Sequence, residues 1–291
     1  MNSVFQKEPL RKVAAIHDIS GVGRCSLTVI LPALSMMGIQ TIPIPTAVLS
    51  SHTGGFGEVA MADLSTYTND ALSHYVHLHY AFDGIYTGFL ASEAQMDTCV
   101  SYFKQWPSSL TLVDPVMGDH GKPYRTYTQG MIEKMSQLIT YADIITPNIT
   151  EAAMLLKETF PAALTRSEAK SILVKLSKKG PRYVLITGVS MVSDEICNLG
   201  YDREKDKFWK ITCNYAPVSY PGTGDLYASV FLGGFLSGDS LPIAIERATR
   251  FLEVAIHTTY SYGTEPREGV LMEKCLPWLT EFRLFTDFTS F

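Results

Sequence analysis

The stretch "SLTLVDPVMGDHGKPYRTYTQGMIEKMSQLITYADIITPNITEAAMLLKETF", residues 109–160, decides the fold class. Two short β-branched runs, 109–115 and 142–148, have the composition of strands. Each is followed by a run of helical period, 128–141 and 149–160. Near-continuous apolar strands that alternate with helices are typical of a parallel sheet covered by helices on both faces.

The same alternation continues in both directions along the chain. One departure is 193–213, where two alternating runs flank a polar turn and predict an antiparallel hairpin at one edge of the sheet. The prolines Pro43 and Pro45 indicate an edge or a strand end. Further strands are expected at 11–17, 39–51, 81–90 and 182–188, and further helices within 21–38 and at 91–106, 167–180, 222–238 and 241–260.

These elements predict an α/β fold: a three-layer α/β/α sandwich whose central sheet is mostly parallel, with an antiparallel edge hairpin. No low-complexity tract, repeat or Pro/Ser-rich linker interrupts the sequence. We therefore expect residues 1–291 to form a single domain.

Composition excludes several classes of function. The net charge of −5, without a long basic run, argues against a nucleic-acid partner. No apolar run approaches the ~18–20 residues of a membrane span, and the start of the chain has no segment typical of a signal peptide. Five scattered cysteines, none in a C-x-x-C pair, are typical of reduced thiols in a cytoplasmic protein.

Polar and flexible residues gather after the predicted strands. In an open parallel sheet, ligands bind beyond the carboxyl ends of the strands. The sequence places there Asp18 and Ser20 with "GVGR", and the stretches "SSHTGGFG", "TGF", "DPVMGDHGKPY", "TPNITE", Thr187–Gly188 and "PGTGD".

"PGTGDLYAS", residues 221–229, is the strongest single motif. Glycines at a helix N-terminus allow the backbone N–H groups to approach a bound oxyanion. Asp225 could take a proton from an attacking hydroxyl while the amides of Gly222, Thr223 and Gly224 stabilise a transferring phosphoryl group. The alternative is that Thr223 or Asp225 only caps the helix.

Two other motifs supply oxygen ligands. "DPVMGD" contributes Asp114 and Asp119, and "TPNITE" contributes Asn148 and Glu151. Such groups suit Mg²⁺, which is usually held by one or two carboxylates together with substrate phosphates. Capping of a helix by Glu151 is the alternative. "DHGKPY" could be a mobile flap or a plain surface loop.

Several patterns are weak or incomplete. "SGVGRCS" gives only G-x-G-x-x-S with no acidic residue about twenty positions on, and no P-loop pattern occurs. The histidines of "HYVHLHY", residues 74–80, have no nearby carboxylate or cysteine, so we interpret them as a helix end or loop. His52 could line a pocket, although a structural role is the more common one. Cys25 is interpreted as a small buried residue.

Taken in order, the motifs resemble the ribokinase-like superfamily of small-molecule kinases, and most closely its vitamin B6 branch, the pyridoxal (pyridoxine, pyridoxamine) kinases. The resemblance runs from about Lys12 to about Tyr262. The superfamily signature is Gly-Thr-Gly-Asp with Thr-Pro-Asn-x-x-Glu, and the B6 branch is indicated by "SSHTGGF" and by "VMGD" followed by Tyr124.

This resemblance implies ATP-dependent phosphorylation of the 5′-hydroxymethyl group of a B6 vitamer by a homodimer, and leaves open a requirement for a monovalent cation such as K⁺. Asp225 would be the base and would also contact the substrate. Gly222, Thr223 and Gly224 would form the anion hole, and Asp114 and Glu151 would organise Mg²⁺. The nucleotide would contact Asp114, Asp119, Tyr124, Asn148, Thr187 and Gly188, and the ring would lie among Asp18, Ser20, Thr46, Thr53 and Phe89.

Some positions depart from the family pattern. Asp18 and Phe89 stand where Ser and Tyr are common, Arg24 stands where Asn is frequent, and the flap is shorter than in animal-type enzymes. The nearest alternative is a hydroxymethylpyrimidine kinase, although many of those carry Cys in place of Asp225. A sugar or nucleoside kinase, a non-catalytic ligand sensor and a nicotinamide-dependent dehydrogenase fit the motifs less well.

Overall fold

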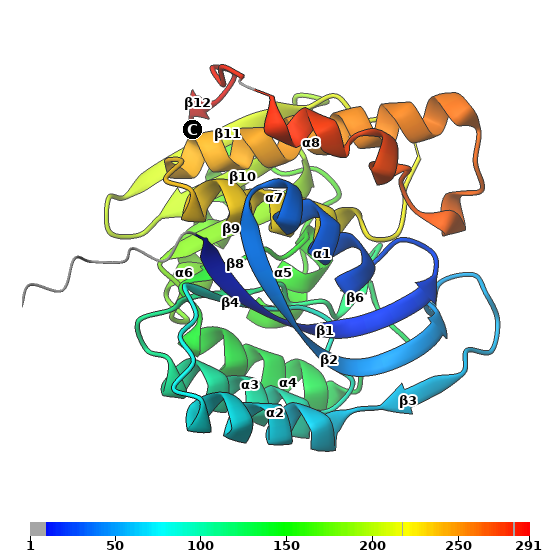
Figure 1. Cartoon of the computed structure of the whole chain (residues 1–291). Coiled ribbons are helices and arrows are strands. Elements are labelled where there is room, and N and C mark those ends of the chain that lie inside the picture. The colour runs from blue at the N-terminus through cyan, green and yellow to red at the C-terminus, as the bar shows by residue number, and fades with distance from the viewer. Residues whose placement is uncertain (1–9, 217, 282) are drawn as a thin grey trace, which may run out of the picture.

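The structure, a computed structural model, describes residues 10–216, 218–281 and 283–291. One sheet forms its centre (Figure 1). Its strands are β1 (Arg11–Val22), β2 (Ile39–Ser51), β3 (Met61–Asp63), β4 (Gly84–Thr87), β5 (Leu110–Val113), β8 (Ile144–Ile145), β9 (Tyr183–Ser190), β10 (Ile196–Asp202), β11 (Lys207–Cys213) and β12 (Thr289–Ser290). The ten strands lie in the order β12-β11-β10-β9-β8-β5-β4-β1-β2-β3.

The middle of the sheet is parallel and its edges are antiparallel. β2, β1, β4, β5, β8 and β9 pair in parallel. β3 adds an antiparallel edge beside β2, and β10, β11 and β12 form the other edge. The predicted mostly parallel sheet with an antiparallel edge hairpin is therefore confirmed.

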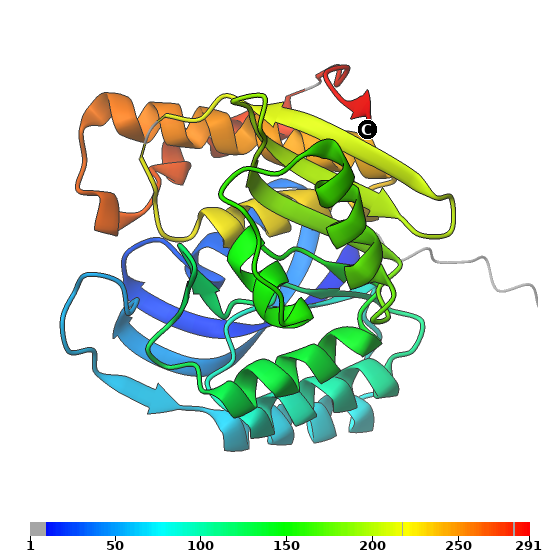
Figure 2. The ribbon, with the colours of Figure 1, turned by 180° about the vertical axis from the view of Figure 1, so that it is seen from behind.

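Helices cover both faces of the sheet, as Figures 1 and 2 show from opposite sides. One hydrophobic cluster packs beneath α3, α4, α5 and α6, and a second packs beneath α1, α7 and α8. The three-layer prediction is confirmed. The helices are α1 (Leu27–Met36), α2 (Ser65–His77), α3 (Glu93–Gln105), α4 (Gln129–Leu138), α5 (Ile149–Leu156), α6 (Arg166–Ser177), α7 (Thr223–Leu236) and α8 (Leu241–Tyr262).

β1 shows why the central strands are apolar without interruption. Ala14 and Ile16 point into the cluster under α3–α6, whereas Val13 and Ala15 point into the cluster under α1, α7 and α8. A strand that is buried on both faces needs an apolar residue at every position rather than at alternate ones.

The prolines of β2 do not break the strand. β2 stays paired with β1 through Pro43 and Pro45. On its other side, β3 pairs only with Ala47–Leu49. The two prolines therefore lie where β2 is the outermost strand, and no N–H is needed there for a second neighbour.

Short elements were the hardest to predict. The "DHGKPY" segment forms a two-stranded sheet, β6 (Gly118–Asp119) with β7 (Lys122–Pro123). α4 ends at Leu138 and is followed by a 3₁₀ turn, η1 (Ile139–Tyr141). After α8, the described residues include the 3₁₀ helices η2 (Pro266–Glu268), η3 (Met272–Lys274) and η4 (Leu276–Thr280).

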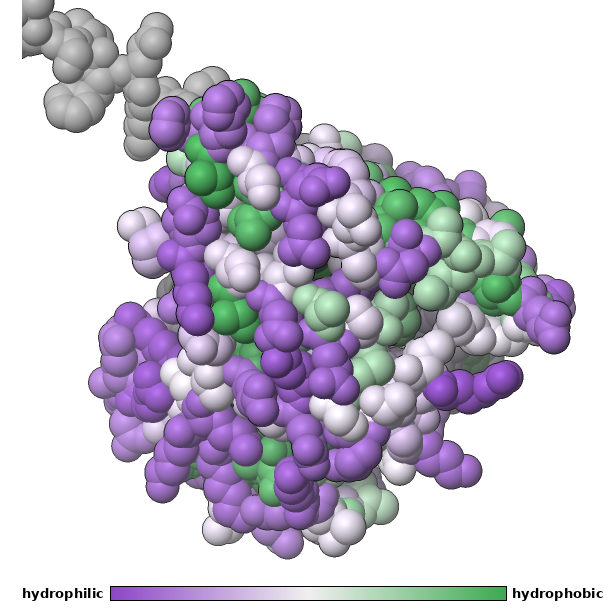
Figure 3. All heavy atoms as spheres, turned by 90° about the horizontal axis from the view of Figure 1, so that it is seen from below, coloured by the Kyte–Doolittle hydropathy of each residue, from purple (hydrophilic) through white to green (hydrophobic). Residues whose placement is uncertain are grey.

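The face seen from below carries mainly hydrophilic residues, with small separate hydrophobic areas (Figure 3). Among the described residues, no helix is both long and apolar enough to cross a bilayer.

Candidate active site

The predicted site residues fall into two groups near the carboxyl ends of the parallel strands. We call Gly222–Asp225 with Asp114, Asn148 and Glu151 the α7 side. We call the group Asp18, Ser20, Thr46, Thr53 and Phe89 the β1–β2 side. Most of these residues follow the carboxyl end of a strand, where ligands bind in such sheets, whereas Asp18, Ser20 and Thr46 lie in the second half of β1 or β2.

The N-terminus of α7 is open. Gly222 is its N-cap residue in the left-handed conformation, with φ 75°, and no described side chain caps the helix. A Cβ on Gly222 would stand 2.0 Å from the carbonyl oxygen of Arg24, so only glycine fits. The Thr223 hydroxyl donates to the carbonyl of Tyr220 at 2.9 Å instead of capping. The first-turn N–H groups are therefore available to an anion.

Asp225 lies in the first turn of α7. Its Oδ2 accepts a hydrogen bond from the backbone N–H of Ser26 at 2.7 Å, and its side chain is 12% exposed. Burial, together with the charge of Asp18, raises the pKa of Asp225 to about 7. A carboxylate with a pKa near neutrality is suited to accept a proton.

A second buried carboxylate, Asp114, lies beside the start of α7. Its Oδ2 is 3.9 Å from the position that a Cβ on Gly224 would take. Burial and then the charge of Asp225 raise the pKa of Asp114 to about 8. Two carboxyl groups are thus brought to one place from distant parts of the sequence.

Glu151 and Asn148 form a complete capping box at the start of α5. Asn148 Oδ1 accepts from Glu151 N–H at 2.9 Å, and Glu151 Oε2 accepts from Asn148 N–H at 2.8 Å. Glu151 Oε1 accepts from Met117 N–H at 3.1 Å. Burial and the charge of Asp114 raise the pKa of Glu151. Glu151 is therefore a cap, and its oxygens keep lone pairs for a further ligand.

The donor set suits a magnesium ion that is completed by a phosphate ligand. The described residues contain no group of three or more His, Cys, Asp or Glu side chains placed to hold a metal by themselves. Asp114 and Glu151 are buried, and the charge of Asp114 adds to burial in raising the pKa of Glu151; a divalent cation would relieve this cost of ionisation. Mg²⁺ usually needs only one or two carboxylates beside phosphate oxygens and waters.

The β6–β7 hairpin is docked on the start of α5. Gly121 N–H donates to Thr150 Oγ1 at 2.9 Å, and Asn148 Nδ2 donates to the carbonyl of Gly118 at 2.9 Å. Asp119 accepts from the N–H of its neighbour His120 and stays partly exposed. Tyr124, which follows the hairpin, is 40% exposed. These residues form the rim of the α7 side.

Thr187 and Gly188 lie next to the same capping box. Thr187 pairs with Asn148 in an isolated bridge, and its N–H donates to the carbonyl of Pro147 at 3.1 Å. Gly188 has φ 63°, is exposed, and donates its N–H to Asn198 Oδ1 at 2.9 Å. Thr187 thus lies beside Asn148, and the predicted contact of Thr187 and Gly188 with a nucleotide stays a prediction.

Three of the five residues on the β1–β2 side, Asp18, Ser20 and Thr46, are buried and form hydrogen bonds with other protein groups. Asp18 is buried and accepts from the hydroxyls of Ser26 at 2.6 Å and Ser20 at 2.9 Å. Thr46 is buried and donates to the carbonyl of Phe89 at 3.4 Å. Only Thr53, which is exposed, and Phe89, which is half-buried beside Tyr127, keep free surface.

His52 connects the 52–57 loop to η2. Its Nδ1 accepts from Gly54 N–H at 3.0 Å, which leaves Nε2–H to donate to the carbonyl of Arg267 at 2.7 Å. The guanidinium of Arg267 lies over the ring of Phe56. The structural interpretation of His52 agrees with these contacts. Cys25 is buried with its pKa raised by burial to about 12, so it is not a reactive thiol.

Sequence reasoning missed Ser26 and His17. Ser26 has φ 52° and ψ −139°, a conformation that serine rarely adopts, and it joins Asp225 to Asp18. His17 lies on β1 with Nδ1 4.0 Å from Asp225 Oδ1. The sequence indicates a role for His17 only by placing it directly before Asp18, a predicted site residue.

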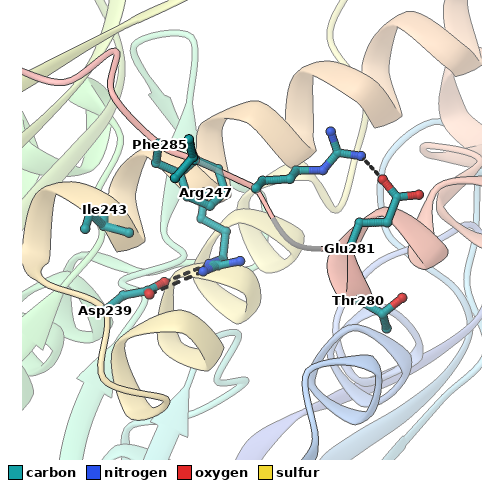
Figure 4. Close-up of a pocket in the computed structure, with 8 residues that line it drawn as sticks. Asp239, Ile243, Arg247, Thr280, Glu281 and Phe285 are labelled. Atoms are coloured by element: carbon teal, nitrogen blue, oxygen red, sulfur yellow. Dashed lines mark hydrogen bonds and ion pairs between the residues drawn. The ribbon is translucent and has the colours of Figure 1, made fainter.

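Two surface hollows lie away from these residues. One of about 530 Å³ lies between α8 and the segment after η4, where Arg247 forms two hydrogen bonds with Asp239 (Figure 4). The other, of about 420 Å³, lies between α3 and α4. Neither is lined by a predicted site residue.

The model of the phosphomethylpyrimidine kinase family matches residues 31–269. The chain belongs to this family. This kinase shares 41% sequence identity with a Bacteroides thetaiotaomicron protein that is provisionally described as a phosphomethylpyrimidine kinase. The two structures superpose with a TM-score of 0.94 over 99% of this kinase and 100% of the Bacteroides chain. A second crystal form of that protein, with pyridoxal, shows 42% identity over 97% of this chain and 100% of that one, with a TM-score of 0.93.

Pyridoxal kinase from Lactobacillus plantarum shares 32% identity, with a TM-score of 0.86, over 93% of this kinase and 96% of that chain. The chloroplastic thiamine biosynthetic bifunctional enzyme TH1 of Arabidopsis thaliana is 28% identical over 264 residues, which are 87% of this kinase. The match spans only 48% of that enzyme's length. The ribokinase-like fold and a kinase of the pyridoxal or hydroxymethylpyrimidine type are thus established.

Proposed function

We propose that the protein transfers the γ-phosphoryl group of ATP to the 5′-hydroxymethyl group of a B6 vitamer: pyridoxal, pyridoxamine or pyridoxine. The observation that carries the proposal is the open N-terminus of α7 with Asp225 in its first turn. A 42% identical relative with pyridoxal in its crystal favours a B6 vitamer as the alcohol.

In this reaction the alcohol loses its proton to Asp225 as its oxygen forms a bond to the γ-phosphorus. The bond between that phosphorus and the bridging oxygen breaks, and ADP leaves with the bond's electron pair. The N–H groups at Gly222, Thr223 and Gly224 stabilise the charge on the transferring group. Asp119, Tyr124, Asn148, Thr187 and Gly188 would border the nucleotide.

Asp114, and Glu151 through water, would hold Mg²⁺, whose charge offsets that of the phosphates when it is bound. On the β1–β2 side, Thr53 and Phe89 would contact the ring directly. Asp18, Ser20 and Thr46 are buried and would shape the floor beneath it. We further propose that residues 1–291 form one domain and that the protein is a cytoplasmic homodimer. A requirement for K⁺ is tested by exchanging K⁺ for Na⁺ in the activity assay.

The second candidate is phosphorylation of hydroxymethylpyrimidine, which the family match itself favours. ADP release should be measured with pyridoxal, pyridoxamine, pyridoxine and hydroxymethylpyrimidine offered separately, and the product identified by mass. A kcat/KM at least ~10-fold higher for one B6 vitamer supports the proposal. The reverse preference assigns the pyrimidine, and no ADP release with any of the four rejects both.

A further inference from the structure

His17 is a fully buried histidine without a hydrogen bond. Its side chain is 0% exposed, and neither Nδ1 nor Nε2 has a partner among the described residues. Buried polar atoms are paired in the great majority of cases, so an unpaired imidazole inside a sheet requires an explanation. Its burial lowers the pKa of His17 to about 3, so the ring is neutral and carries one N–H.

The ring is held in one position by its neighbours. It packs edge-to-face on Tyr86, with the ring centroids 4.3 Å apart. On another side lies Gly88, where a Cβ would come within 2.2 Å of His17 Cε1 and 2.3 Å of Nδ1. Gly88 does not have a left-handed φ, so its backbone does not need glycine. Glycine at 88 makes room for the imidazole.

The nearest charged group is Asp225. Its Oδ2 is held by Ser26 N–H at 2.7 Å, while Oδ1 lies 4.0 Å from His17 Nδ1. No Lys or Arg of the described residues forms an ion pair with Asp225. Other ionisable groups interact with Asp225 from several elements: Asp18 on β1, Cys25 before α1, Tyr86 on β4, Asp114 after β5 and Tyr124 after β7.

We propose that His17 is a positioning residue for Asp225, to which it donates Nδ1–H at Oδ1. The proposal rests on the role of Asp225 as the base under the proposed function. Rotation of the carboxylate that shortens the 4.0 Å separation by about 1 Å gives an ordinary hydrogen bond. One donor on each oxygen then fixes the carboxylate, and each oxygen keeps a lone pair for the proton of the alcohol.

The first test does not depend on activity. Nitrogen-15 NMR of the labelled full chain reports the tautomer of each histidine, and the signal that disappears in His17→Asn identifies His17. The expected result at pH 7 is a neutral ring with the proton on Nδ1. A proton on Nε2, or a charged ring, overturns the proposal while leaving the kinase function intact.

The second test separates positioning from packing. His17→Leu should lower kcat about 10-fold with little change in KM. Because loss of the donor destabilises the ionised carboxylate, the acid limb of the kcat/KM profile should move about one unit to higher pH. Ile16→Val, a buried change on β1 that faces the opposite helical layer, is the control and should leave kcat and the profile unchanged.

Two amide variants sharpen the test. The side-chain nitrogen of Asn can replace Nδ1, whereas that of Gln replaces Nε2. His17→Asn should restore kcat to within about 3-fold of the wild type, and His17→Gln should not. Equal activity of the two, or wild-type kcat in His17→Leu, overturns the proposal. Failure of the kinase function itself would instead appear as no ADP release by the wild type with any of the four alcohols, and wild-type turnover in Asp225→Asn would remove the base role on which the proposal rests.

Discussion

The α7 side and the β1–β2 side of the site differ in how their polar groups are used. On the α7 side, the N–H groups of the first helical turn have no side-chain cap, and the buried carboxyl groups have raised pKa values. On the β1–β2 side, Asp18, Ser20 and Thr46 are buried and already hydrogen-bonded within the protein. Under the proposed function, the first side would supply chemistry that many alcohols can share, whereas the choice of alcohol would depend on the few exposed groups of the second.

The strongest test of this contrast is Asp225→Asn. We expect kcat to fall ~10²–10⁴-fold, because a positioned proton acceptor is lost. The folded pKa of about 7 lies above the unfolded value near 4, so ionisation costs stability as pH rises between them. The uncharged variant should therefore be at least as thermally stable as the wild type at pH 8. Wild-type turnover would contradict the role of Asp225.

Gly222→Ala tests the shape of the open helix end. Gly222 and Gly38 share φ 75°, but a Cβ at 222 would meet the Arg24 carbonyl, whereas a Cβ at 38 would meet nothing within 4 Å. Gly38→Ala should cost about 1–2 kcal/mol of unfolding free energy, and Gly222→Ala about 3 kcal/mol or more. Chemical denaturation measures both, and equal losses would show that the contact with Arg24 is unimportant.

Glu151→Gln tests the metal role against the capping role. We expect the Mg²⁺ concentration for half-maximal activity to rise about 10-fold, since a carboxylate that attracts the ion is lost. Glu168 has the same place in the capping box of α6, the next helix along the chain, and is the matched control. A Mg²⁺ titration that is the same in Glu151→Gln and Glu168→Gln would leave Glu151 with capping alone.

The smallest effect is expected on the β1–β2 side. Thr53→Val should raise the KM for the alcohol about 3-fold with little change in kcat, because one exposed hydroxyl is lost. Thr46→Val, a buried change on the same side, should alter thermal stability rather than KM. If instead Thr53→Val left kcat and KM unchanged and Thr46→Val raised the KM, then the buried Thr46 and not the exposed Thr53 would be the residue that contacts the alcohol.

The sequence predicted the parallel sheet, the hairpin at 193–213 and the gathering of Asp114, Asn148, Glu151 and Asp225, because each follows a strand or begins a helix. It did not show which polar groups are already paired. Asp18 accepts hydrogen bonds from the hydroxyls of Ser20 and Ser26, and the second contact depends on the unusual backbone conformation of Ser26. The proximity of His17 to Asp225 joins residues 208 positions apart and has no local pattern.

Arg24 is held by its main chain and by its side chain, which pairs with Glu273 and donates to the carbonyl of Glu268. Its carbonyl oxygen lies where a Cβ on Gly222 or Gly269 would collide with it, and its N–H donates to the carbonyl of Glu268. These main-chain contacts do not depend on the side chain at position 24, whereas Gly222 and Gly269 leave no room for a Cβ. Two glycines that stand 47 positions apart in the sequence thus both depend on the path of the backbone at a third, distant position.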